Sequence, residues 1–121
     1  MLTLSEATCY YIYLYNTDMR KGFDSLCGIV SSEMRFDPLS SDVYVFINRR
    51  RTQIKLLHWE GDGFALYYKR LEQGTYELPQ VQGNECCTSV SIGHLQNIFQ
   101  GVSVSQNRHR KRYQHSAKSC G

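Results

Sequence analysis

Hydrophobic and polar positions alternate along this chain in patterns that predict several short strands and two helices. The run CYYIYLY, residues 9–15, is aromatic and β-branched over the length of one strand. Asn16, Thr17 and Asp18 then provide a turn and an N-cap. Apolar residues next recur at helical spacing, at Met19, Phe23, Leu26, Val30 and Met34. The first unit is therefore predicted to be a strand followed by a helix, which ends at Asp37 and Pro38.

Three strand-like runs follow, at residues 43–48, 53–60 and 64–70. The connections are short, at 49–52 and at the Gly-Asp-Gly turn of 61–63, which favours antiparallel hairpins and a three-strand meander over about 43–70. Alternation places one set of side chains on one face: Leu57, Trp59, Phe64 and Leu66. The opposite face carries Ile54, Leu56, His58, Ala65, Tyr67 and Lys69. The first set is the better candidate for the core.

The last third of the chain is less regular. Residues 72–85 contain Gly74, Pro79 and Gly83 and predict a loop, with a short strand near Tyr76. Residues 88–92 are either a last strand or a cap for the helix that follows. That helix is predicted from helical spacing at Leu95, Ile98, Phe99 and Val102, and ends near Gly101. The order of elements predicts an α+β fold, a small antiparallel sheet packed on one face by two amphipathic helices.

Composition supports one folded domain. The chain has 121 residues, of which 41% are hydrophobic and 12% aromatic. We expect a single domain over residues 1–105 and a basic, disordered tail over 106–121. The start of the chain has no signal-peptide pattern, and no apolar run is long enough to cross a membrane. Five cysteines at irregular spacings favour free thiols, so the expected location is the cytoplasm, with no membrane partner.

Positive charge is concentrated in two places. Of the fourteen basic residues, five lie in the last fourteen positions, so residues 1–107 carry nine basic and eleven acidic residues, or −2. Residues 49–70 nevertheless hold six basic and two acidic residues, or +4. The candidate nucleic-acid or partner-binding residues are Arg49, Arg50, Arg51, Lys55, Lys69 and Arg70, with Arg20 and Lys21 in the first turns of the predicted helix.

Other interpretations of these basic residues stay open. Arginines occupy exposed turns because water solvates them well, and lysines at strand ends protect an edge from aggregation. The hairpin could equally meet an acidic protein surface. Arg20 is also four residues before Asp24, a spacing that suits an ion pair within a helix.

Patterns for catalysis or metal binding are missing from the sequence. It contains no CxxC or HxxxH, no GxSxG and no phosphate-binding GxxxxGK[ST]. Cys86 and Cys87 are adjacent, so on a strand they point to opposite faces. We therefore predict no catalytic residues, no metal, no cofactor and no small-molecule substrate. An acidic triad assembled by the fold stays an open alternative.

Three segments together resemble a known family: TDMRKGFDSL at 17–26, DPLSSDVYVFINRRRTQIKLLHWEGDGFALYYKRLEQGTY at 37–76, and LQNIFQGV at 95–102. They are similar to the TnpB accessory proteins, products of the second open reading frame, of the insertion-sequence 66 family of bacterial mobile elements. The resemblance implies a protein that assists DNA transposition beside a separate transposase and a second accessory protein. It brings no catalytic residues. Ser41 and Ala65 depart from the family pattern, and the basic tail extends beyond it.

The combined expectation is a non-catalytic transposition accessory protein that contacts element DNA, the transposase or both through the basic hairpin. The alternative is a protein–protein adaptor for the transposase that does not bind DNA directly. Such an adaptor could use the same basic residues or the tyrosine-rich first strand as an exposed sheet edge.

Overall fold

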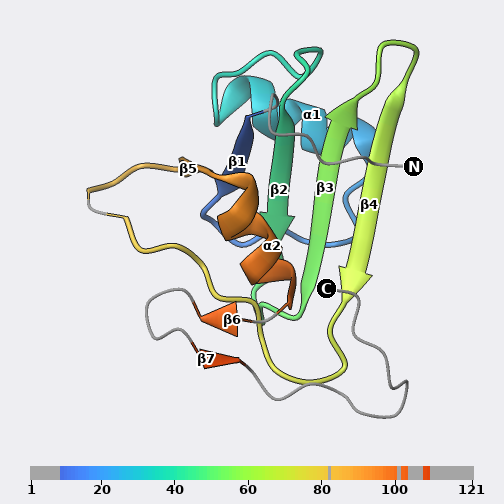
Figure 1. The fold of residues 1–121 in the computed structure, drawn as a ribbon. Helices are drawn as coiled ribbons and strands as arrows, with labels where there is room; N and C mark the ends of the chain where they lie inside the picture. The colour runs from blue at the N-terminus through green and yellow to red at the C-terminus, as the bar shows by residue number, and fades with distance from the viewer. Residues whose placement is uncertain (1–8, 82, 101, 104–107, 110–121) are drawn as a thin grey trace.

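The protein folds as a five-stranded sheet with two helices (Figure 1). The computed structural model describes residues 9–81, 83–100, 102–103 and 108–109. The strands of the sheet are β1 (Tyr10–Tyr13), β2 (Val43–Ile47), β3 (Gln53–Trp59), β4 (Phe64–Arg70) and β5 (Cys87–Val90). The helices are α1 (Phe23–Ser32) and α2 (Ile92–Gln100). The predicted α+β class is confirmed.

The sheet is mixed, with the strand order β4-β3-β2-β1-β5. Consecutive strands β2, β3 and β4 pair antiparallel, as do β1 and β5. Strand β1, however, pairs parallel with β2, with Tyr10 opposite Val43. The prediction of a purely antiparallel sheet was therefore wrong. The cause is α1 and the loops around it, which form a crossover that returns the chain to the end of the sheet where β1 began.

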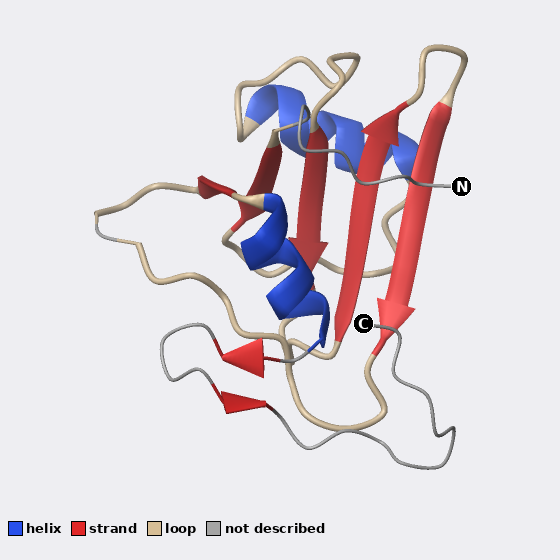
Figure 2. Cartoon of the chain, in the orientation of Figure 1, coloured by secondary structure: helices blue, strands red, loops and turns tan. Residues whose placement is uncertain are grey.

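The two helices cover opposite faces of the sheet (Figure 2). On one face Leu26 and Val30 of α1 belong to a core cluster with Leu57 of β3. On the other face Leu95 and Ile98 of α2 belong to a second core cluster with Leu56, which precedes Leu57 in β3. The expectation that both helices lie on one face was wrong, and the face of Leu56 is as much a core as the face of Leu57. The sheet is apolar on both faces because a helix covers each of them.

Helix α1 begins later than its periodicity predicted. Gly22 is the N-cap, without a side-chain hydrogen bond, and Phe23 is the first helical residue. Met19, Arg20 and Lys21 therefore precede the helix and do not form its first turn. The cause lies in local hydrogen bonds: the Asp18 carboxylate accepts the backbone N–H of Arg20 at 2.9 Å, and Asp18 O accepts that of Lys21 at 3.1 Å. These bonds form a turn that competes with the helix.

Both readings of residues 88–92 are correct in part. Strand β5 occupies Cys87–Val90, and the Ser91 hydroxyl then accepts the backbone N–H of His94 at 3.0 Å at the start of α2. The predicted tail at 106–121 lies outside the described residues, except that Arg108–His109 (β7) pair with Val102–Ser103 (β6). Gly101, the predicted helix end, also lies outside them.

Tyr76 lies in the loop after β4, where the structure assigns no strand among residues 71–81, so the short strand expected there was wrong. Its backbone N–H instead donates to the carbonyl of Arg51 at 2.7 Å. The side chain is fully buried, and its hydroxyl has no hydrogen-bond partner among the described residues. Desolvation by burial, with a smaller contribution from Tyr67, raises the pKa of Tyr76 well above its ordinary value.

We expect Tyr76→Phe to keep or slightly raise the free energy of unfolding at pH 7, because it removes a buried hydroxyl that lacks a partner. Burial of the neutral phenol contributes its full stability below pH 10. Above pH 10 the phenol ionises in the unfolded chain before it does so in the folded one, so the free energy of unfolding falls as pH rises. At pH 11 the wild type should lose about 1 kcal/mol more than the Phe variant. Urea unfolding at pH 8 and pH 11 measures the difference, and equal losses in both proteins would contradict it.

Candidate nucleic-acid interface

The three consecutive arginines lie in the loop that joins β2 to β3, and side-chain hydrogen bonds fix the backbone of that loop. The Asn48 carboxamide oxygen accepts the backbone N–H groups of Thr52 at 2.8 Å and Gln53 at 2.9 Å. Arg51 N–H donates to Asn48 O at 3.0 Å, and Arg51 adopts a left-handed conformation with φ 59°. Asparagine at a turn commonly bonds the backbone in this way. The backbone of the loop is therefore held in one conformation by hydrogen bonds, and the three arginine side chains that it carries are exposed.

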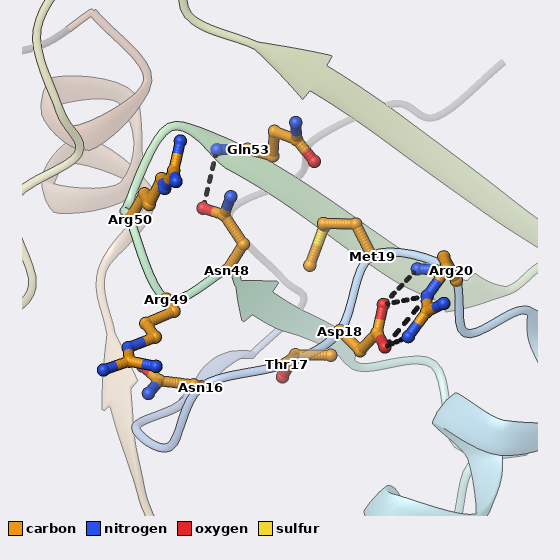
Figure 3. Close-up of a pocket in the computed structure, with 9 residues that line it drawn as sticks. All are labelled: Asn16, Thr17, Asp18, Met19, Arg20, Asn48, Arg49, Arg50 and Gln53. Carbon is orange, nitrogen blue, oxygen red and sulfur yellow. Dashed lines mark hydrogen bonds and ion pairs between the residues drawn. The ribbon is translucent and has the colours of Figure 1, made fainter.

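A second segment lies beside this loop because β1 and β2 run parallel. The chain leaves both strands at the same end of the sheet, and the Thr17 N–H donates to Ile47 O at 3.1 Å. Between the two segments is an open hollow of about 670 Å³ (Figure 3). Its lining residues are Asn16, Thr17, Asp18, Met19, Arg20, Asn48, Arg49, Arg50 and Gln53. The fold thus brings together two segments that the sequence predicted to bind nucleic acid or a partner, one with Arg20 and one with Arg49 and Arg50.

Arg20 is paired with Asp18. Its guanidinium donates to both carboxylate oxygens, with the shortest distance 2.7 Å (Figure 3). Hydrogen bonds from Arg20 hold the pKa of the Asp18 carboxyl well below its usual range. The alternative of an Arg20–Asp24 pair within the helix is wrong, since Arg20 lies before α1. The charge of Arg20 is therefore offset locally, although both side chains are well exposed.

Lys55 has a different position from the other predicted residues. It lies in the middle of β3 and is only 8% exposed. Its ammonium donates to Met19 O at 2.7 Å and to Lys21 O at 2.9 Å, and it lies 5.1 Å from the ring centroid of Tyr68. Lys55 thus ties the segment before α1 to the sheet, and its donors are directed at the backbone.

The remaining predicted residues divide between the two faces of the sheet. Lys69 is half-buried opposite Ile54 on the α2 side, whereas Arg70 is opposite Gln53 on the α1 side. Arg70 pairs with Glu72 at 3.3 Å in an exposed ion pair. Lys21 is exposed and directly follows residues 16–20, which form one wall of the hollow. The predicted basic hairpin is therefore not one continuous ridge, because alternate positions of a strand point to opposite faces.

The loop arginines Arg49, Arg50 and Arg51 give this end of the sheet positive charge that is not offset by ion pairs in the described part of the chain. Within the described residues none of the three has an acidic partner within ion-pair distance. The same part of the chain contains no cluster of three His, Cys, Asp or Glu side chains that could hold a metal ion. An excess of guanidinium groups suits binding of phosphates or carboxylates.

Sequence reasoning missed the polar groups of this site. Asn16, Thr17, Asn48 and Gln53 line the hollow, but none belongs to a motif with a known ligand. Asn48, directly before three arginines at a predicted turn, was the one available signal, because asparagine so often organises turns.

Comparison with known proteins identifies the family. The model of the family described as IS66 Orf2 like protein matches residues 8–109. The chain belongs to this family. Members are accessory proteins associated with insertion sequences, and the family is not a known catalytic one. No solved structure matches this chain.

Two relatives of this chain come from Sinorhizobium fredii (strain NBRC 101917 / NGR234). The uncharacterised protein y4hO is 29% identical over 102 residues, which cover 84% of this chain and 87% of that protein. The uncharacterised protein y4jC is 34% identical over 65 residues, 54% of this chain and 56% of that protein. In the described part of the chain, neither helix has the length and apolar character that a membrane crossing requires.

Proposed function

We propose that this protein assists transposition by holding DNA of its element against the arginine loop, residues 48–52, while the separate transposase performs the chemistry. The observation that carries the proposal is a hydrogen-bonded loop with three exposed arginines and no acidic partner among the described residues. The family supports the setting, since its members accompany insertion sequences.

Physical chemistry favours phosphate as the ligand of this loop. Each arginine that neutralises a phosphate releases condensed counterions, which provides most of the affinity of non-specific DNA binding. A fixed backbone lowers the entropy cost of presenting three long side chains together. Because residues 1–107 carry −2 overall, the rest of the domain does not attract DNA. Binding through this domain should therefore depend on the loop.

We expect Arg49→Ala/Arg50→Ala/Arg51→Ala to weaken binding to duplex DNA from the ends of the element by at least about tenfold at low salt. Three lost phosphate contacts should also reduce the slope of log K against log salt by about 2.7, at about 0.9 per contact. Fluorescence anisotropy across a salt series measures both quantities. The variant with three lysines at these positions keeps the charge and should keep most of the slope.

A matched control removes the same charge elsewhere. Arg110→Ala/Lys111→Ala/Arg112→Ala deletes three basic residues from the region 106–121 and leaves the arginine loop intact. Under the proposal this variant keeps more affinity than the loop variant. If the loop variant binds like wild type, the proposal fails.

Under the adaptor alternative we propose a different strand as the one that receives the partner. Strand β1 lies between β2 and β5, so the tyrosine-rich first strand is not a sheet edge. The long edge is β4, whose Tyr67 and Tyr68 are 38% and 53% exposed. An extended segment of the transposase could add to this edge as a further strand. Co-purification of the transposase after nuclease treatment, unchanged in the loop variant, would favour this alternative.

A further inference from the structure

The hollow beside the arginine loop has properties that a duplex-binding surface does not need. Its volume of about 670 Å³ lies within the range of about 300 to 1,000 Å³ usual for small-ligand pockets. The outer surface of a duplex presents phosphates and sugars, and its bases cannot enter such a space without unpairing. A single nucleotide of an unpaired strand could enter it.

The charge of the lining suits a phosphate. Its basic residues are Arg20, Arg49 and Arg50 and its one acidic residue is Asp18, so the formal charge is three minus one, or +2. The Asp18 carboxylate is engaged with Arg20 through several hydrogen bonds. Arg49 and Arg50 are therefore the positive groups left over for an anion.

An exposed aromatic ring lies next to the same wall. The Tyr68 hydroxyl donates to the side-chain oxygen of Gln53, a lining residue, at 3.0 Å. The Lys55 ammonium is 5.1 Å from the centroid of this ring, yet the side chain stays 53% exposed. Aromatic rings beside basic grooves are the usual platforms on which proteins stack unpaired bases.

We infer that the hollow binds one nucleotide of single-stranded DNA, with its phosphate against Arg49 and Arg50 and a neighbouring base stacked on Tyr68. This inference rests on the proposed contact between the arginine loop and DNA and specifies the form of DNA. Unpaired strands arise wherever a DNA end is opened or cut, so the site would recognise a product or intermediate of strand separation and not the intact duplex.

The test compares two probes on the full chain: a labelled strand of ten thymidines and a labelled duplex of fifteen base pairs, at one salt concentration. Tyr68→Leu should weaken binding of the single strand about tenfold through lost stacking. It should change duplex affinity by less than about twofold, because duplex binding does not need the ring.

A matched control separates the site from general effects. Tyr68→Phe keeps the ring and should bind the single strand like wild type. Thermal unfolding should show that Tyr68→Leu is about as stable as wild type, since the Tyr68 side chain is 53% exposed.

Three results would overturn the inference. They are equal losses on both probes in Tyr68→Leu, no loss on the single strand in that variant, and a single strand that still binds fully when the three loop arginines are alanine. The first two leave the arginine-loop proposal intact if the triple alanine variant loses duplex binding. If that variant keeps duplex binding as well, the proposed function fails too.

Discussion

Replacing Leu56 by alanine is expected to lower the free energy of unfolding by about 2 to 5 kcal/mol, as much as replacing its neighbour Leu57. Both leucines are fully buried in β3 but point to opposite faces. Leu56 packs in the cluster that includes Leu95 and Ile98 of α2, and Leu57 in the cluster that includes Leu26 and Val30 of α1. Each substitution leaves a cavity in a separate core, so the two losses should be similar.

Urea unfolding of both variants, followed by circular dichroism, measures these losses. Leu39→Ala is the control, because Leu39 is 53% exposed and should change stability by no more than about 0.5 kcal/mol. A small loss in Leu56→Ala beside a large one in Leu57→Ala would mean that α2 does not cover the sheet as described.

Replacing Lys55 by methionine is expected to destabilise the protein by about 2 to 4 kcal/mol. Methionine keeps the packing of the side-chain stem but cannot donate to the carbonyls of Met19 and Lys21, which the ammonium of Lys55 meets at 2.7 Å and 2.9 Å. Hydrogen bonds from charged donors are the stronger class, and acceptors left without a donor add a penalty. The segment before α1 should therefore loosen first.

Two measurements check this expectation. Thermal unfolding gives the loss in stability, and hydrogen exchange should show faster exchange at residues 16–21 than in β2 and β3. Lys21→Met is the matched control, because it removes the same charge from an exposed side chain nearby and should cost no more than about 0.5 kcal/mol. A Lys55→Met protein with wild-type stability would show that these bonds contribute little.

Local patterns were enough to predict most elements of this fold. The alternation over residues 43–70 and the Gly-Asp-Gly turn predicted three strands close to where β2, β3 and β4 lie. Helical spacing located α1 and α2, because their buried residues recur three and four positions apart. Such patterns depend only on neighbours in the sequence, which is why they could be interpreted without a structure.

The main errors came from interactions between distant segments, and one of them also from local hydrogen bonds. Nothing near CYYIYLY indicates that β1 enters the sheet parallel to β2, since that pairing depends on the path of the chain through α1. The start of α1 was predicted too early because Met19 lies four residues before Phe23 and therefore fits the helical spacing of apolar residues. Asp18 and Lys55 instead hold the backbone of residues 19–21 outside the helix.

The candidate site shows the same division. Its arginines were obvious from charge, and the loop that carries them was predicted as a turn. Lys55 was grouped with them because it adds to the positive charge of residues 49–70, yet it is buried in β3 and bonded to backbone carbonyls. The hollow could not be predicted, because it exists only where residues 16–20 meet residues 48–53.

The parallel pairing of β1 with β2 limits how this site can be separated from the domain. A hairpin peptide spanning β2 to β4 would carry every arginine of the loop but only one wall of the hollow. The other wall arrives from a segment about thirty residues earlier, held in place by the strand pair and by Lys55. Any exchange of this loop between relatives therefore has to include the residues after β1, since the two stretches form a single surface.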